Sequence, residues 1–268
     1  MIDYPKLRNW WSQQARTLPT QAGILAVDNE LESAYRQYAE WRHFRQLVRL
    51  KQNMNVLEVG CGGGRWALLI APHVKHVTAV DFSDEMIRVA RQRQQQAGVA
   101  NLEFVTASAA EFMSSLHYHI IYFSGVLQYL DDDDCRRAIR NAVSMLAPGG
   151  TIIDRSSCAT PNREVCNNGA YQAIYRTKEE LKSMFQEFGF RLTYHSSSYR
   201  PMRLPGRLLV KPRVVNALSW CMRQHPVPTY LLVRIASVLV NWLRPLPQPP
   251  SCFHRSHDFF RFELASGS

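Results

Sequence analysis

The chain has 268 residues, 46% of them apolar, so it is large enough to bury one sizeable core. It contains no apolar run long enough for a membrane-spanning helix, and residues 1–5 lack the pattern of a secretory signal. The six cysteines include no C-x-x-C pair, which predicts reduced thiols, a cytoplasmic protein and no zinc site.

The net charge of +10 is unevenly distributed along the chain. Residues 200–268 contain ten Arg or Lys and two acidic residues, a net of +8, whereas residues 1–199 contain 22 basic and 20 acidic residues, a net of +2. The basic segment indicates an anionic substrate or a peripheral contact with anionic lipid at the inner membrane face. A basic surface that serves only solubility is the alternative interpretation.

The first 50 residues are predicted to form a helical cap. Residues 1–28 show no clear period and are expected to cover one end of the core, whereas residues 29–50 are predicted to be a helix with Asn29 as its N-cap. Apolar side chains recur there at helical spacing, namely at Tyr35, Tyr38, Trp41, Phe44 and Leu47 or Val48. This stripe favours packing on a sheet; the alternative is a lid over a ligand site, with Arg36 or Arg42 contacting the ligand.

Residues 55–70 predict a strand, a glycine-rich turn and a helix. Four of the five residues from Gly60 to Gly64 are glycine, and a helix-compatible run starts at Trp66. Glycine allows positive φ and close approach of a ligand to the backbone, and the start of a helix offers unpaired N–H groups. The pattern predicts a loop that binds a nucleotide-like ligand; a turn without a ligand is the alternative.

A second strand, from His76 to Val80, ends at Asp81. A carboxylate at the tip of this strand is suited to bind ribose hydroxyls. The alternative role, a charge at the start of a helix, is already filled by Ser83 and the acids that follow it in the helix 84–97.

Two further strands, Leu102–Thr106 and Tyr118–Phe123, are each followed by small or polar residues, Ser108 and Ala109 after the first and Ser124 after the second. The four aspartates at 131–134 are predicted to stabilise the helix that follows them rather than to bind a metal.

The rest of the chain predicts a fifth strand from Thr151, a functional polar loop over residues 156–176, and a helix over 177–188. A sixth strand over 191–195 is followed by a proline-rich, basic segment with two apolar stretches, and residues 254–264 form a seventh strand.

Four motifs occur together in this chain. They are E-x-G-x-G-x-G from Glu58, Asp81, V-L-x-Y-L at 126–130 and L-A-P-G-G at 146–150. Over roughly residues 50–200 this combination resembles the class I S-adenosylmethionine-dependent methyltransferase superfamily, of the type 11/25-like kind.

The resemblance implies an α/β fold with a Rossmann-like, doubly wound sheet of seven strands, the first six parallel and the seventh antiparallel. It implies a methyltransferase core over residues 51–200 plus 252–264. The helical N-terminal cap (1–50) and the basic, proline-rich helical insertion or lid (201–251) lie outside the resemblance and are predicted from the residues alone.

The resemblance also implies S-adenosylmethionine as cofactor, S-adenosylhomocysteine as product, and no metal. The residues expected to bind the cofactor are Glu58, Gly60, Gly62, Gly64, Asp81, Phe82, Ser108, Ala109 and Ser124. Ser108 stands where the family usually has an aspartate near the adenine amino group; a hydroxyl can accept the same hydrogen bond without charge assistance.

The acceptor is expected to be a small molecule, a glycan or a lipid-linked compound, methylated on oxygen. The tip of the fourth strand reads F-S-G-V, without the D/N-P-P motif of amide or adenine methylation and without an aspartate for Mg²⁺. The chain also lacks a recognisable nucleic-acid module, which makes a nucleic-acid partner unexpected.

Histidine is the usual general base for a hydroxyl acceptor, and the catalytic candidates are His195 and His257, with His254 beside them. Tyr175 and Arg176 are candidates for binding an anionic acceptor.

The insertion is expected to shape the acceptor pocket and to touch an anionic membrane through basic and aromatic residues. These are Arg203, Arg207, Lys211, Arg213, Trp242 and Arg244. Two other functions stay open: an NAD(P)-dependent oxidoreductase, because Gly62–Ala67 loosely fits the dinucleotide fingerprint, and a methyltransferase-fold binding module without catalysis.

Overall fold

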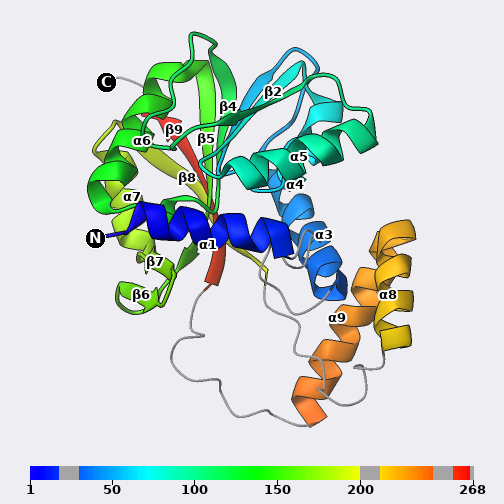
Figure 1. Cartoon of the computed structure of the whole chain (residues 1–268). Coiled ribbons are helices and arrows are strands. Elements are labelled where there is room, and N and C mark those ends of the chain that lie inside the picture. Colours follow the sequence, from blue (N-terminus) through cyan, green and yellow to red (C-terminus); the bar gives the residue numbers. More distant parts are fainter. Residues whose placement is uncertain (18–29, 200–211, 244–255, 266–268) are drawn as a thin grey trace.

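The computed structural model describes residues 1–17, 30–199, 212–243 and 256–265, and its centre is a seven-stranded sheet (Figure 1). The strand order is β3-β2-β1-β4-β5-β9-β8. The strands are β1 (Asn55–Val59), β2 (His76–Asp81), β3 (Leu102–Thr106), β4 (Tyr118–Ser124), β5 (Leu146–Cys158), β8 (Phe190–Tyr199) and β9 (Ser256–Leu264). β1 to β5 pair in parallel, and β9 is antiparallel to both of its neighbours, β5 and β8. The predicted fold class is therefore confirmed.

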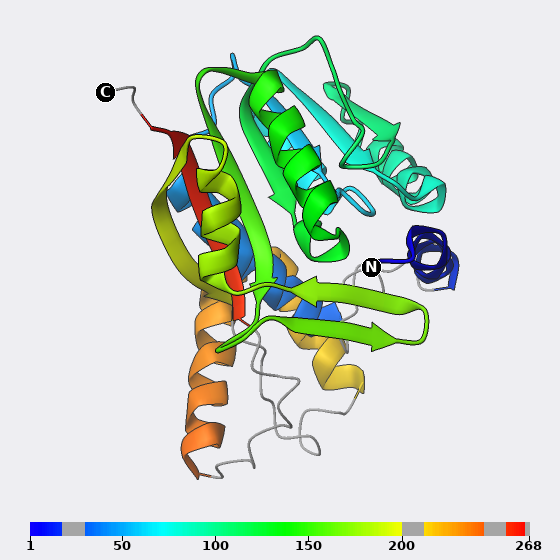
Figure 2. The same ribbon diagram turned by 90° about the vertical axis from the view of Figure 1, so that its left-hand side faces the viewer.

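Helices cover both faces of the sheet and bury two apolar clusters. On one face lie α6 (Asp132–Met145) and α7 (Lys178–Gln186), and on the other lie α3 (Glu30–Leu47), α4 (Arg65–Ile70) and α5 (Asp84–Ala97). Figure 2 shows the green α6 and yellow-green α7 in front of the sheet, with the blue α3 behind it. The central strands β1 and β2 are mostly buried, as expected of parallel strands that helices cover on both faces.

The helix starts follow the capping signals in the sequence. The Ser83 hydroxyl accepts a hydrogen bond from the Met86 amide at the start of α5, and the Asp131 side chain accepts one from the Asp134 amide at the start of α6. Thr177 and Glu180 form the predicted capping box of α7. The acids at 131–134 therefore serve α6, as predicted.

The aromatic stripe of α3 divides between two partners. Its second half packs on the sheet, where Phe44 contacts Trp66 and Tyr122. In its first half, Tyr35 stacks on Tyr230 of α9 (Pro226–Leu243) at 4.9 Å between ring centroids. The predicted cap Asn29 lies outside the described residues.

The segment predicted as a helical cap (1–50) contains the helix α1 (Tyr4–Thr17), over a stretch in which the sequence shows no clear period. One prediction about an irregular segment is wrong. The predicted polar loop at 156–176 is mostly strand: β5 continues to Cys158, and β6 (Glu164–Asn168) pairs with β7 (Tyr171–Tyr175) as a separate hairpin. The β6 side chains are largely exposed, so that strand lacks the apolar alternation that sequence reasoning uses.

Between β8 and β9 the chain forms α8 (Pro212–Gln224) and α9, which lie beside α3, away from the sheet (Figure 1). Of the residues expected to touch a membrane, Arg203, Arg207, Lys211 and Arg244 lie outside the described residues. No helix within the described ranges is long and apolar enough to cross a bilayer.

Candidate functional site

The glycine-rich loop leaves β1 at the carboxyl edge of the sheet and has a backbone that only glycine tolerates. Gly60 and Gly64 have φ values of 81° and 78°. A Cβ atom at Gly60 would lie 2.6 Å from the Cβ of Val126, and one at Gly64 would lie 2.7 Å from the Cζ of Phe104. The loop is thus packed against the residues that follow β4 and against β3.

Asp81 at the end of β2 is tied to this loop. Its Oδ2 accepts a hydrogen bond from the Gly62 amide at 2.9 Å, and its Oδ1 accepts one from the Ser83 amide at 3.0 Å. Burial raises the pKa of Asp81 to about 6, although both amides act to lower it. The side chain is half-buried, so its carboxylate lies between the loop and the outside of the fold.

Glu58 lies on β1, two residues before the loop, and is fully buried. Neither of its carboxyl oxygens has a hydrogen-bond partner of normal geometry among the described residues. Burial raises the pKa of Glu58 to about 8, while the Ser124 hydroxyl and the Arg65 charge act to lower it. A buried acceptor without a partner is costly, which favours a cationic or donor group of a ligand beside it.

The remaining predicted cofactor contacts lie along the same edge. Ala107 donates its amide to the Asp81 carbonyl at 3.0 Å, and Ser108 follows directly. The Ser108 hydroxyl accepts a hydrogen bond from the Ala110 amide at 3.3 Å, and both Ser108 and Ala109 are half-buried. Ser124 ends β4, one strand over from Glu58. The structure therefore brings these residues together at the edge formed by β1, β2, β3 and β4.

The helix α1 covers this edge (Figure 1). The sequence predicted that residues 1–28 cover one end of the core, but it did not show which end. The Ser12 hydroxyl forms a hydrogen bond of 2.9 Å with that of Ser83, and the Arg8 guanidinium lies 5.7 Å from the ring centre of Phe82. Trp11 packs against Tyr129 with 5.4 Å between ring centroids. Phe82 thus lies between β2 and the covering helix α1. The Trp10-Trp11 pair was the available signal, because large aromatics seldom occur side by side on a purely solvated helix.

The residues proposed for a lid on α3 have other positions. Arg36 is buried and donates to Glu40 at 3.0 Å, whereas Arg42 is exposed. Glu40 also accepts hydrogen bonds from Arg65 and Arg155. Burial alone would raise the pKa of Glu40, but the three guanidinium groups hold it well below its usual range. α3 is therefore attached to the core through an ionic cluster.

The two catalytic candidates lie on the β5-β9-β8 side of the same edge. The Nδ1 atom of His257, on β9, is 3.0 Å from the Ser157 hydroxyl of β5. The Nε2 atom of His195, on β8, is 3.0 Å from Asp258 Oδ1, and the ring is stacked on Phe260. His254 lies outside the described residues.

Arg176 has a structural position rather than the predicted anion-binding one. Its guanidinium is buried and donates to the carbonyl groups of Leu127 and Leu130 at 2.7 and 2.8 Å, and to Asp132 at 2.6 Å. The two carbonyl groups belong to the turn between β4 and α6, and Asp132 is the first residue of α6. The side chain therefore fixes that turn, and its charge is already matched by Asp132.

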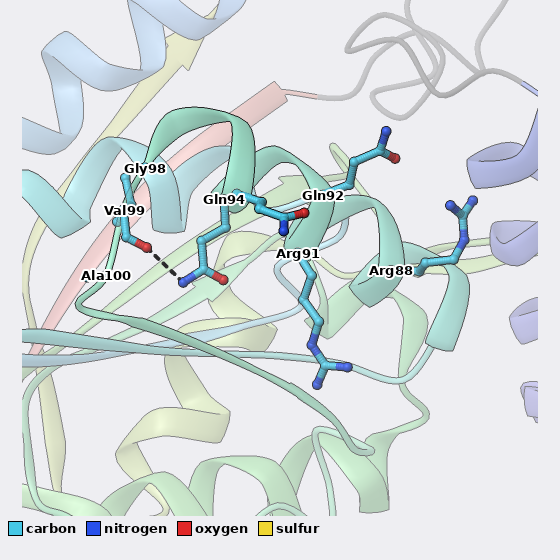
Figure 3. Close-up of a pocket in the computed structure, with 8 residues that line it drawn as sticks. Arg88, Arg91, Gln92, Gln94, Gly98, Val99 and Ala100 are labelled. Atoms are coloured by element: carbon cyan, nitrogen blue, oxygen red, sulfur yellow. Dashed lines mark hydrogen bonds between the residues drawn. The ribbon is translucent and has the colours of Figure 1, made fainter.

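A surface hollow of 720 Å³ lies elsewhere, on the outside of α5 (Figure 3). Its lining includes Arg88, Arg91, Gln94 and Gly98, and none of the predicted site residues. The hydrogen bond from Gln94 to the Val99 carbonyl holds the end of α5 there (Figure 3). In the described residues no group of three His, Cys, Asp or Glu is placed to hold a metal ion.

Comparison with known proteins gives one protein-family match: residues 56–150 fit the family model described as a methyltransferase domain. Nodulation protein S of Sinorhizobium fredii is 31% identical over 134 residues, which is 48% of this chain and 61% of that protein. Demethylmenaquinone methyltransferase of Listeria welshimeri is 27% identical over 150 residues, which is 53% of this chain and 62% of that protein.

Among solved structures, the N-methyltransferase NodS of Bradyrhizobium japonicum, in complex with S-adenosylhomocysteine, superposes with a TM-score of 0.55. It is 23% identical, and the match covers 72% of this chain and 91% of that one. This similarity shows a shared fold. The chain spans only about three fifths of the length of the curated relatives it matches.

Proposed function

We propose that this chain, whose residues 56–150 match the family model of a methyltransferase domain, belongs to the class I S-adenosylmethionine-dependent methyltransferases and transfers a methyl group from S-adenosylmethionine to a small-molecule acceptor. The observation that carries the proposal is the hydrogen bond between Asp81 and the Gly62 amide. It joins a half-buried carboxylate to a loop that only glycine can form.

The residues at the edge fit this cofactor in chemical kind. Glycine at 60 and 64 lets the loop pack closely on Val126 and Phe104 with positive φ, and the loop backbone would lie against the amino-acid end of the cofactor. The Asp81 carboxylate is placed to accept hydrogen bonds from ribose hydroxyls, and the unpartnered Glu58 oxygens are matched by an ammonium group. Ser108 and Ala109 would contact the adenine, and Phe82 would contact the adjacent face of the adenine ring.

When bound, the cofactor supplies a methyl group that is already activated on a sulfonium. The protein then has to align the acceptor and exclude water. The helix α1 would exclude water, because it covers the edge through Ser12 and Trp11. The Ser124 backbone at the end of β4 would border the reacting groups.

The acceptor is proposed to be methylated on oxygen, with His257 taking the hydroxyl proton. Its Nδ1 atom contacts the Ser157 hydroxyl, which orients the ring. His195 is the weaker candidate, because Asp258 and Phe260 hold its ring. A nitrogen acceptor is the second candidate, because the structurally similar NodS is an N-methyltransferase. Glycan and lipid-linked acceptors remain within the proposal.

Cofactor choice is tested by isothermal titration calorimetry with S-adenosylmethionine, S-adenosylhomocysteine and NADH. We expect micromolar binding of the first two and none of NADH, because the order E-x-G-x-G-x-G places an acid before the loop. Binding of NADH alone would instead support an oxidoreductase. Transfer of a labelled methyl group to any member of an alcohol, phenol and amine panel separates an enzyme from a binding module.

The proposed base is tested with His257→Ala and with His195→Ala as its comparison. We expect His257→Ala to lower kcat by about 10²–10⁴-fold on an oxygen acceptor and to leave S-adenosylhomocysteine affinity unchanged. An equal kcat in wild type and variant would remove His257 from the mechanism.

A further inference from the structure

The helix α9 carries an apolar face that no described residue covers. Val227, Leu231, Leu232 and Ile235 are each 49–60% exposed. They recur at helical spacing, so they lie on one side of the helix. On the opposite side, Thr229 and Val233 are buried, and Tyr230 stacks on Tyr35 of α3. Val227, Leu231, Leu232 and Ile235 are called the α9 face below.

An amphipathic helix on a globular protein normally turns its apolar side to the core and its polar side to water. α9 has apolar residues on both sides, and only one of them is used within the fold. Four large exposed apolar side chains in one contiguous strip mark an interaction surface rather than ordinary scatter. On the neighbouring helix, Trp220 is 55% exposed as well.

The stretch of sequence that contains this face has charged residues of one sign only. From residue 188 to residue 257 the sequence has no Asp or Glu, while it has ten basic residues: Arg191, Arg200, Arg203, Arg207, Lys211, Arg213, Arg223, Arg234, Arg244 and Arg255. Arg234 lies on α9 next to Ile235, and Arg223 lies in the last turn of α8; both are exposed. These two arginines are the described cations nearest to the α9 face in the sequence, and the face itself contains no acid.

We propose that the α9 face docks on an anionic lipid bilayer, with Val227, Leu231, Leu232 and Ile235 in the interfacial layer and Arg223 and Arg234 on the headgroups. An apolar strip flanked by arginines is the composition of helices that lie in the membrane interface. The helix would rest on the bilayer and not cross it, since it is not apolar enough to span.

A second copy of the chain is a poorer occupant. A twofold contact through the α9 face would bring identical surfaces together, so the arginines of one copy would approach those of the other. Like charges across a contact oppose association. Anionic phosphates have the opposite effect, and they match the cations that border the strip. This proposal does not depend on methyl transfer, because a chain without that activity would still expose the same face.

The test is co-sedimentation of the full chain with sucrose-loaded vesicles of phosphatidylcholine alone or with 30 mol% phosphatidylglycerol, a composition chosen to be about one third anionic. We expect binding to the anionic vesicles and weakening as NaCl rises, because screening shortens the reach of the arginines. One variant, Leu231→Ser/Leu232→Ser/Ile235→Ser, removes the apolar side chains of the α9 face and is called the strip variant. A second variant, Arg223→Gln/Arg234→Gln, removes the two positive charges. Each is expected to weaken binding by about tenfold or more.

Matched controls lie on other surfaces: Val165→Ser replaces an exposed apolar residue of β6, and Lys182→Gln an exposed cation of α7. Both should bind vesicles like the wild type. Circular dichroism of each variant shows whether it has folded, and a folded strip variant that still sediments like the wild type overturns the proposal. Absence of wild-type binding to anionic vesicles overturns it too. A third outcome would assign the face to a second copy instead: the wild type is a dimer in light scattering and does not bind vesicles, and the strip variant is a monomer.

Discussion

Glu40 of α3 and Arg155 of β5 form a buried ion pair across 115 residues of sequence, with Arg155 Nη2 donating to Glu40 Oε1 at 2.7 Å. The same carboxylate accepts hydrogen bonds from Arg36 and from Arg65, the first residue of α4. One acid thus accepts hydrogen bonds from three guanidinium groups, which come from α3, α4 and β5. The cluster joins the outer helix to the glycine-loop helix and to the centre of the sheet.

The first prediction concerns this cluster. Glu40→Gln leaves three buried arginines without their shared counter-charge, so we expect the free energy of unfolding to fall by about 3–5 kcal/mol. The measurement is urea denaturation followed by circular dichroism. Glu187→Gln removes the partner of Arg136 in an exposed ion pair and should cost only a small fraction of that loss. Equal losses of unfolding free energy in the two variants would show that the buried cluster stabilises the fold no more than an exposed ion pair does.

The second prediction concerns Asp81. Asp81→Asn should weaken S-adenosylhomocysteine binding by about tenfold or more at pH 7.5, because the ribose loses a charged acceptor. The folded-state pKa of about 6 adds a pH dependence: wild-type affinity should fall as the pH drops through 6 and Asp81 takes up a proton. Calorimetry between pH 5 and 8 checks both effects. Asp84→Asn, an exposed acid three residues on, is the matched control; if it weakens binding as much, Asp81 has no specific role.

The third prediction concerns the stability contributed by Glu58. Its folded pKa of about 8 lies above the ordinary value of 4.5, so the folded state holds the proton more tightly than the unfolded state. The stability this group contributes is therefore complete below pH 4.5 and is lost as the pH rises to 8. Glu58→Gln stays neutral, so without ligand it should be more stable than the wild type at pH 9 by several kcal/mol.

The check on Glu58 is thermal unfolding at a series of pH values between 5 and 9. The two curves should diverge with rising pH. Glu103→Gln, on β3 and exposed, should follow the wild type throughout. Parallel curves for wild type and Glu58→Gln would contradict the prediction.

The fourth prediction concerns the cover over the edge. S-adenosylhomocysteine should slow amide hydrogen exchange in α1, because a ligand between the sheet edge and the helix stabilises the closed arrangement. Mass spectrometry of peptides from residues 4–17 gives the readout. Peptides from α7, which lies on a face of the sheet, should exchange at unchanged rates. Trp11→Ala should reduce the protection of α1, since it removes the contact with Tyr129. Uniform protection of both helices would mean that α1 is no cover.

Local signals were enough for much of the fold. Ser83, Asp131 and Thr177 begin helices where their side chains predict it, because a cap is a hydrogen bond within three residues. The positive-φ glycines and the acid at the tip of β2 were also visible, because each depends on one or two neighbouring residues. The β6-β7 hairpin was missed, since it is stabilised from outside, for example by the hydrogen bond from the Asp3 amide to Gln172.

The sequence by itself determined the alternation of strands and helices and placed Gly60–Gly64 and Asp81 at one edge, because both follow from spacing along the chain. Only the tertiary structure decided that α1 covers that edge, that Arg36 and Arg155 share Glu40, and that Arg176 supports a turn. These outcomes depend on contacts between residues far apart in sequence, and a long charged side chain can reach several partners from one backbone position. The partner of such a side chain depends on where the fold buries it, and a local sequence pattern does not contain that information.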